Sequence, residues 1–431
     1  MIKENKFDIA VVGAGPAGMI AAGVAAESGA KVVLIEKNKQ LGKKLLLTGN
    51  GRCNLTNAEF NLPELVKNYN NGEFLFHAFS VFGPKEVINF FEKLGVKTKI
   101  EEGKRVFPKS DDSEKVLEAL NKYLAKNKVN ILFNSEVASV EMEGNPPSPK
   151  ATAGRRKISK LILKDREITA EKYIFCTGGK SYPLTGSDGL GYKLAEKLGH
   201  TIVKPMPALS PIKLKEEWVK NLQGISLRDV KINVSKNGLP AGQAGKKQFS
   251  EKGEILFTHF GISGPAVLNI SAKVGELLEK DGVKICLDLF PALTQEELLK
   301  KLEETSKRYP KKNIKNTLSD FVPEKLAEVL LDITGVNKNK IASNISRPER
   351  AIIVKTLKNL EVAAESILGF DEAKVTRGGV FLEEIDHKTM KSKIINNLFF
   401  AGEIIDVDGK TGGFNLQMCW STGYIAGKSR E

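Results

Sequence analysis

The 431-residue sequence predicts an α/β protein, in which a Rossmann-like three-layer domain is split by a β-barrel-like insert and a helical cap. Three observations lead to this prediction. A complete strand–helix–strand unit occupies residues 7–37, two later strands run into paired glycines, and the middle of the chain changes to short strands and then to helices. Because both ends of the chain share one pattern and the middle does not, we interpret the middle as an insertion.

Residues 7–37 contain every element of a βαβ unit in order. The apolar run "DIAVV" predicts a buried strand, "GAGPAG" a tight turn, "PAGMIAAGVAAESG" a helix and "KVVLIE" a second strand. The helix is predicted to stop at Gly29, a residue type that commonly caps helix C-termini. The ordered series is far more specific than the glycine spacing alone, and a glycine-rich turn in an ordinary α/β domain is the less favoured alternative.

The glycine spacing predicts that this unit binds a dinucleotide. Gly13 permits the tight turn, Gly15 lets the backbone approach a pyrophosphate, and Gly18 lets the helix pack closely on the strand. The helix N-terminus attracts the phosphates. Glu36, at the end of the second strand, stands where an acid binds ribose hydroxyls. This unit does not distinguish NAD from FAD.

Two later junctions favour FAD. The strand in "EKYIFCTGGKSYP", residues 171–183, ends at paired glycines, and residues 396–430 repeat a strand, a glycine loop and a final helix. A flavin dinucleotide must be held at both ends. The final helix begins near Gly413, and its N-terminus can face the flavin edge where negative charge collects on reduction.

The middle of the chain predicts two inserted parts. Short strands separated by glycine and lysine fill residues 200–270, and amphipathic helices fill residues 290–358. Exposed loops are predicted at 144–156 and 238–248. The predicted domains are an FAD-binding domain at 1–199 and 366–431, a β-rich insert at 200–275 and 350–365, and a helical cap at 276–349.

Composition narrows the classes of protein. The net charge is +14, but the lysines are scattered, so a solvated surface is favoured over a nucleic-acid footprint and a small-molecule substrate over RNA. No run of 18 apolar residues occurs, which predicts no membrane span, and no signal peptide is recognised. The four cysteines are far apart, which predicts reduced thiols, no metal site and a cytoplasmic location. Oligomeric state is not predicted.

Several motifs together resemble one bacterial family of FAD-dependent oxidoreductases, the aminoacetone oxidase-like and bile-acid alkene reductase-like flavoproteins. They are "VVGAGPAG", "KKLLLTGNGRCNLTN", "TGGKSYPLTGS", "THFGISGPAVL", "VTRGGV" and "LFFAGEIIDVDGKTGGFNLQ", and they run from residue 7 to about 427. "TGSDGLGY" at 185–192 departs from the expected Thr-Gly-Asp-Gly order, which leaves Ser187 and Asp188 without a predicted role.

The resemblance implies non-covalent FAD and a loop at 44–57 that runs along the pyrophosphate and the flavin edge. The residues expected to bind FAD are Gly13, Ala14, Gly15, Pro16, Ala17, Gly18, Glu36, Lys37, Lys44, Thr48, Gly49, Asn50, Arg52, Cys53, Asn54, Val137, Thr177, Gly178, Gly179, Gly402, Glu403, Gly413, Phe414, Asn415 and Leu416. For Cys53, packing is favoured over a role as nucleophile.

Arg52, Tyr182 and His259 are the candidate catalytic residues. Arg52 is either a ligand contact or a salt bridge to a neighbouring loop. The expected reaction is hydride transfer through FAD, with NADH, NADPH or a small organic molecule as donor. A tRNA-modifying flavoprotein, which would use the positive charge, and a non-catalytic flavin sensor are the alternatives.

Overall fold

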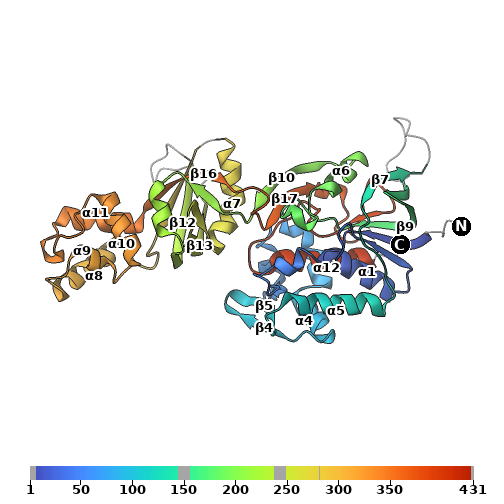
Figure 1. Cartoon of the computed structure of the whole chain (residues 1–431), viewed down its shortest axis with the longest axis horizontal. Coiled ribbons are helices and arrows are strands. Elements are labelled where there is room, and N and C mark those ends of the chain that lie inside the picture. Colours follow the sequence, from blue (N-terminus) through green and yellow to red (C-terminus); the bar gives the residue numbers. More distant parts are fainter. Residues whose placement is uncertain (1–5, 144–155, 237–248, 281, 429–431) are drawn as a thin grey trace. The chain divides into compact units, whose positions relative to one another are not determined.

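The computed structural model describes residues 6–143, 156–236, 249–280 and 282–428 (Figure 1). Two compact units divide the chain: residues 1–207 with 373–431, and residues 208–372. The predicted loop at 144–156, apart from Arg156, and the predicted loop at 238–248 lie outside the described residues.

The first unit is built on a seven-stranded sheet. Its strands are β6 (Asn130–Leu132), β2 (Val32–Ile35), β1 (Lys6–Val12), β9 (Glu167–Phe175), β8 (Ile158–Leu163) and β7 (Val137–Met142) in that order, with β18 (Leu398–Phe400) beside β9. The strands β6, β2, β1, β9 and β18 are parallel, whereas β7 and β8 pair antiparallel with each other and with β9. The predicted first strand forms because its apolar run is buried, with Ala10 and Val11 fully covered.

Two helices with small residues pack directly against each other on this sheet. They are α1 (Pro16–Glu27) and α12 (Phe414–Lys428). A methyl group at Gly423 would lie 2.4 Å from the carbonyl oxygen of Ala17, and one at Gly427 would lie 2.5 Å from that of Ala21. The backbones therefore touch with no room for a side chain, and the glycines of the last helix set the distance between the two helices.

The remaining elements of this unit surround that core. The helices are α2 (Leu62–Val66), α3 (Phe76–Val81), α4 (Pro84–Lys93), α5 (Ser113–Lys126) and α6 (Leu190–Lys197). A small antiparallel sheet contains β3 (Thr56–Asn57), β5 (Arg105–Pro108) and β4 (Thr98–Glu101), and a separate pair contains β10 (Ile202–Ala208) and β17 (Val375–Val380).

The second unit holds a closed barrel and a group of helices. The barrel strands, in spatial order, are β11 (Ile212–Leu214), β14 (Gly261–Ser263), β13 (Phe249–Phe257), β12 (Ser226–Lys236), β15 (Val283–Asp288) and β16 (Leu360–Ile367). The helices are α7 (Pro265–Leu278), α8 (Gln295–Arg308), α9 (Ile314–Leu318), α10 (Glu324–Thr334) and α11 (Arg347–Lys358). One hydrophobic core runs through both parts.

The predicted fold class is confirmed: a Rossmann-like domain, a closed six-stranded barrel and a helical region are all present. One helix, α7, begins inside a stretch where the sequence predicted strands. It begins because Gly264, at φ +97°, turns the chain and Pro265 occupies its first position. Helix α11 lies in the predicted helical stretch and continues to Lys358, after which β16 starts. The three-part division of the chain with its exact boundaries stays a prediction.

Among the described residues, no helix combines the length and the apolar character that crossing a bilayer requires.

The contact between α1 and α12 yields a stability prediction. Gly423→Ala should lower the melting temperature, because overpacking a tight contact costs roughly 1–3 kcal/mol, more than the roughly 0.5–1 kcal/mol that alanine gains in helix propensity. The control is Gly369→Ala, where an added methyl group meets no atom within 4 Å. Thermal unfolding followed by circular dichroism measures both, and equal melting temperatures would contradict the close-packing argument.

Candidate flavin-binding site

A cavity opens at the carboxyl ends of the parallel strands, where ligands bind in open α/β sheets. Its walls come from segments that are far apart in the sequence. They are residues 12–17, 35–38, 42–44, 135–137, 176–178 and 185–188, with Leu190, Leu194, Gly402, Glu403 and Cys419. We call this cavity the cradle.

The three glycines of the first turn have different roles in the cradle. A methyl group at Gly13, which has φ +96°, would lie 2.5 Å from the carbonyl oxygen of Cys176, and one at Gly18 would lie 1.8 Å from that of Gly13. Both glycines are thus required by packing. A methyl group at Gly15 meets no atom within 4 Å. Gly15 therefore keeps space open in front of the N-terminus of α1, whose first N–H groups have no acceptor within the helix.

Buried polar groups line the same cradle. The Glu36 carboxylate accepts hydrogen bonds from the Ala14 amide at 2.9 Å and from the amide and side chain of Asn38, both at 2.8 Å. A carboxylate has about four lone-pair positions, so one remains for a ligand hydroxyl. The Thr177 hydroxyl is buried without a hydrogen-bond partner among the described residues. A cavity with an unused acceptor and an unpaired hydroxyl fits a hydroxyl-rich ligand.

Residues 185–188, in the segment that departs from the family pattern, line the cradle. The Lys37 ammonium lies 2.7 Å from the Asp188 carboxylate, and Lys43 donates to the carbonyl of Leu184 at 2.6 Å. Asn38 donates to the Thr185 carbonyl at 3.0 Å. These contacts fasten residues 184–188 to the segment that follows β2, so Asp188 acquires a positioning role here.

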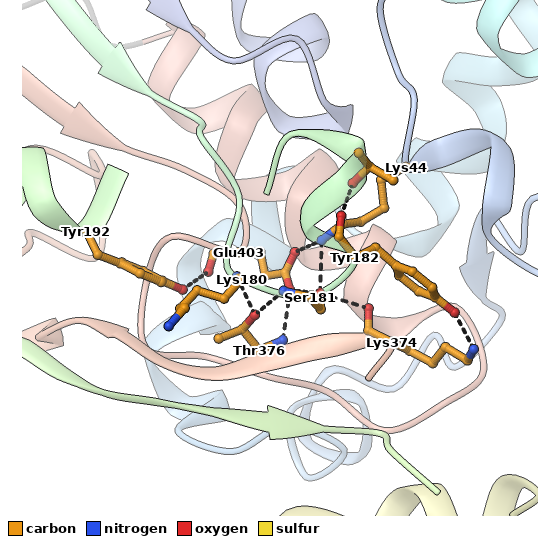
Figure 2. A network of polar contacts seen from close by, with 9 residues as sticks. Lys44, Lys180, Ser181, Tyr182, Tyr192, Lys374, Thr376 and Glu403 are labelled. Atoms are coloured by element: carbon orange, nitrogen blue, oxygen red, sulfur yellow. Dashed lines mark hydrogen bonds and ion pairs between the residues drawn. The ribbon is translucent and has the colours of Figure 1, made fainter. Parts of the chain in front are cut away.

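A polar network joins four separate segments at the other end of the cradle (Figure 2). Glu403 accepts hydrogen bonds from the Thr376 amide at 2.8 Å and from the Ser181 hydroxyl at 3.0 Å, and it lies 3.0 Å from the Lys44 ammonium. Lys44 also donates to Ser181 at 2.9 Å, and the Thr376 hydroxyl accepts from the amide of Lys180 at 2.7 Å. Because both charges are partly buried and each is hydrogen-bonded to more than one segment, this network fixes the position of each segment.

Tyr182 follows this network in a strained conformation. Its φ of +50° is unusual for a bulky residue, and it precedes Pro183, which favours an extended backbone at the residue before it. Its phenol hydrogen-bonds to the Lys374 ammonium, which also lies 5.0 Å from the centre of the ring (Figure 2). Strain of this kind persists only where the surroundings hold the residue firmly, and it is common at functional sites.

The polar run at residues 48–57 is largely explained by the helix that it meets. With its amide oriented to satisfy its neighbours, Asn54 accepts a hydrogen bond from the Gly413 N–H at 3.0 Å. Asn57 donates to the Gly412 carbonyl at 3.0 Å. The second half of the run therefore caps the N-terminus of α12, whereas Asn50 in its first half is exposed.

Arg52 and Cys53 belong to the same polar run, residues 48–57, and the surroundings of both give them structural roles. Arg52 pairs with Glu101 and with Asp111, at 2.8 Å from its Nε, and its guanidinium lies 4.0 Å above the ring of Phe107. The hydrogen bonds to Glu101 and Asp111 raise its pKa. Cys53 is fully buried, and burial raises the pKa of its thiol to about 12, so it is protonated at neutral pH.

Asp406 and Asp408 form an acidic pair in the loop that leads to α12. The Arg377 guanidinium holds Asp408 with two hydrogen bonds, of 2.9 and 3.1 Å. Asn71 donates to the Asp406 carboxylate at 3.3 Å. Burial, together with the charge of Asp408, raises the pKa of Asp406 to about 6. The pair thus adds a carboxyl group that titrates near neutral pH.

The cradle contains about half of the residues predicted to bind the cofactor. Those that line it are Gly13, Ala14, Gly15, Pro16, Ala17, Glu36, Lys37, Lys44, Val137, Thr177, Gly178, Gly402 and Glu403. The others do not line it: Gly18 and Gly179 are packed against backbone or side chains of neighbouring segments, Thr48, Gly49, Asn50, Arg52, Cys53 and Asn54 lie in the polar run, and Gly413, Phe414, Asn415 and Leu416 lie at the start of α12. His259 lies exposed between β13 and β14 in the second unit.

Sequence reasoning missed several residues that line the cradle. They include Asn38, Gly42, Lys43, Ser135, Glu136 and Cys176. Their common signal is position, because most follow directly after β2 or β6 or end β9, where parallel strands present their carboxyl ends. Within the described ranges, no group of three or more His, Cys, Asp or Glu residues could hold a metal ion.

A Rossmann-like sheet, a glycine turn before α1 and a cradle lined by hydrogen-bonding groups define a dinucleotide-binding protein, and the comparisons with known proteins place it among the FAD-binding oxidoreductases. Residues 7–429 match the family model described as "HI0933-like protein Rossmann domain". The chain belongs to that family.

Relatives align with almost the whole chain. A 3-dehydro-bile acid delta(4,6)-reductase of Clostridium scindens is 32% identical over 98% of both chains. A ribosomal RNA dihydrouridine synthase of Haemophilus influenzae is 30% identical over 97% of both chains. The solved 3-ketosteroid delta1-dehydrogenase of Sterolibacterium denitrificans shares the fold, with a TM-score of 0.51, 12% identity and coverage of 98% of this chain and 99% of that one.

Gly15 provides a test of the cradle that separates cofactor binding from folding. Gly15→Val should retain the fold, since the space beside Gly15 is open, yet abolish FAD content because the side chain enters the region in front of α1. Gly18→Ala is the contrasting variant and should lower the melting temperature through its clash. The ratio of flavin to protein absorbance and a thermal melt measure both effects. Full FAD content in Gly15→Val would show that the phosphates bind at another position.

Glu36 provides a second test. A hydrogen bond to a charged group contributes roughly 1.5–3 kcal/mol, so Glu36→Ala should weaken FAD binding by about tenfold or more. The control is Glu136→Ala, which removes an exposed carboxylate that also lines the cradle. Titration of the apoprotein with FAD gives both dissociation constants, and equal values for the two variants would argue against a specific role of Glu36.

Proposed function

We propose that the protein is an FAD-dependent reductase that adds a hydride and a proton across a carbon–carbon double bond conjugated with a carbonyl group, with NADH or NADPH as the electron donor. The observation that carries the proposal is the match, along nearly the whole chain, to two relatives whose names describe this kind of reaction. Reduction of a 3-dehydro, delta(4,6) substrate and reduction of uridine to dihydrouridine both saturate an alkene activated by a carbonyl.

In this proposal the cradle binds FAD along its length, and bound FAD supplies the hydride. Gly13 to Ala17 would hold the pyrophosphate on the N-terminus of α1, and Glu36 would accept a hydrogen bond from the ribose. Val137 would lie beside the adenine. The Glu403–Lys44 pair would hold the ribityl chain, and the N-terminus of α12 would stabilise negative charge on the flavin.

Tyr182 is the best supported proton donor among the three candidate residues. It adjoins Ser181, which is bonded to Glu403 in the cradle, and its phenol is bonded to Lys374. The phenol would give its proton to the carbon next to the carbonyl, and Lys374, which is exposed, would connect it to solvent protons. Arg52 is engaged by two carboxylates, and His259 belongs to the second unit, so both have weaker support.

A small enone is the proposed substrate, and uridine in RNA is the second candidate. Two observations favour the second: the relative named as a ribosomal RNA dihydrouridine synthase, and the net charge of +14. Both substrates need the same hydride and proton additions, so the cradle alone does not separate them.

An anaerobic assay in two stages tests the proposal. The purified yellow protein is first mixed with NADH or NADPH, and bleaching of the flavin absorbance is expected. The reduced protein is then offered a 3-oxo-4,6-diene steroid acid or a ribosomal RNA transcript, with reoxidation followed at the flavin band and a gain of two hydrogens measured by mass spectrometry. Reoxidation by oxygen alone, with neither product formed, would contradict the proposed reaction.

The kinetic order is a further prediction. Beyond residues 13–18, the sequence contains no second G-x-G-x-x-G set between a strand and a helix, so no separate nicotinamide domain is expected. The nicotinamide and the acceptor should then approach the same face of the flavin in turn. Initial rates over a grid of both concentrations should give parallel double-reciprocal lines. Intersecting lines, with a ternary complex seen by stopped-flow, would reject a shared face.

A further inference from the structure

Two segments of the helical region contain basic residues but no acidic residue. Residues 305–319 contain five basic residues and residues 333–348 contain three, and neither segment contains an aspartate or glutamate. They are separated in sequence by α10 and its flanking acids. We call them together the basic loop pair.

The fold brings the two segments into direct contact. Asn313 and Ile341 form a β-bridge, and the Ile314 amide donates to the Lys340 carbonyl at 2.8 Å. The Ala342 amide donates to the Lys312 carbonyl at 2.9 Å. The end of α8, the start of α9 and the connection between α10 and α11 therefore form one surface.

Half of the charge on this surface is neutralised within the helical region. Four lysines form ion pairs with nearby acids: Lys312 with Asp320 at 2.9 Å, Lys315 with Glu328 at 2.8 Å, Lys338 with Asp332 at 2.8 Å and Lys340 with Glu349 at 2.7 Å. The other four basic residues are Lys307, Arg308, Lys311 and Arg347. All four are exposed, and none forms an ion pair with any residue that the structure describes. An excess of four cations thus faces solvent.

An exposed aromatic ring lies among these cations. Tyr309 is 44% exposed, with the Arg308 guanidinium 5.6 Å and the Lys312 ammonium 5.2 Å from its ring centre. The same two segments also expose asparagine side chains, at positions 316, 339 and 344. A π-face for stacking, cations for phosphates and amides for sugar and base edges are the components of single-stranded nucleic-acid binding sites.

We propose that the basic loop pair binds RNA, with an unpaired base stacked on Tyr309 and the backbone phosphates on Arg308, Lys311 and Arg347. An anionic membrane is less well matched, because interfacial segments place several large apolar side chains beside their cations. Here the large exposed apolar side chains are Tyr309, Ile333 and Ile341. Both isoleucines belong to the second segment, whereas three of the four unpaired cations belong to the first. The surface shares no residue with the cradle, so RNA binding here does not depend on the reaction proposed above.

Fluorescence anisotropy with a labelled RNA stem–loop and the flavin-loaded protein tests this inference. The triple variant Arg308→Ala, Lys311→Ala and Arg347→Ala should raise the dissociation constant about tenfold or more at 0.1 M salt, and should lower the slope of log affinity against log salt by about 2. The matched control is Lys213→Ala, Lys252→Ala and Lys284→Ala, which removes the same charge from the barrel. The control should change affinity by less than about threefold.

Variants of Tyr309 distinguish base stacking from binding by charge alone. Tyr309→Ala should weaken binding about tenfold, and Tyr309→Phe should retain it, because a base stacks on either ring. Equal losses in the two triple variants, no effect of Tyr309→Ala, or binding to vesicles of 70% phosphatidylcholine and 30% phosphatidylglycerol in place of RNA would each overturn the proposal. Flavin content and NADH-dependent bleaching, measured on every variant, report separately on the proposed reaction.

Discussion

The close approach of backbone to backbone at the carboxyl edge of the sheet is the constraint on which this structure depends. Gly18 lies against the Gly13 carbonyl and Gly423 against that of Ala17, so the first turn, α1 and α12 are in direct contact. A side chain at either position would separate the helix from its neighbour. The cradle has its shape because these contacts fix the first turn and the two helices beside it.

This rigid floor supports polar groups that would be unstable alone. Glu403 and Lys44 are partly buried charges, and each is hydrogen-bonded by segments that the sheet and the glycine contacts hold in place. Removing one partner would leave the other charge buried and unpaired, which is far more costly than losing an exposed ion pair. The same network positions Ser181 and, because it is the next residue, the strained Tyr182. The position of the proposed proton donor therefore depends on how these segments pack.

Charge is organised differently in the two units. In the first unit, Arg52 forms ion pairs with Glu101 and Asp111, and Lys37 forms one with Asp188. In the helical region of the second unit, Asp320 follows α9, and Glu328 and Asp332 lie in α10. These acids pair with nearby lysines, and four other cations of the basic loop pair stay exposed. The positive side chains behind the net charge of +14 are therefore not spread evenly over the protein. Those near Tyr309 that form no ion pair make a surface suited to phosphates.

The sequence by itself determined the features that depend on local pattern. Apolar periodicity and glycine spacing over a few turns predict the strand–glycine–helix–strand unit, the place of Glu36 at the end of the second strand, the final helix, and the change to strands and then helices in the middle. Tertiary structure decided the features that join distant segments. Lys44 meets Glu403 across 359 residues, Asn54 caps α12, and residues 305–319 meet 333–348 only because the chain returns there. Hydrophobic period is encoded locally, but which polar side chain finds which partner depends on the path of the backbone, and no spacing in the sequence records that path.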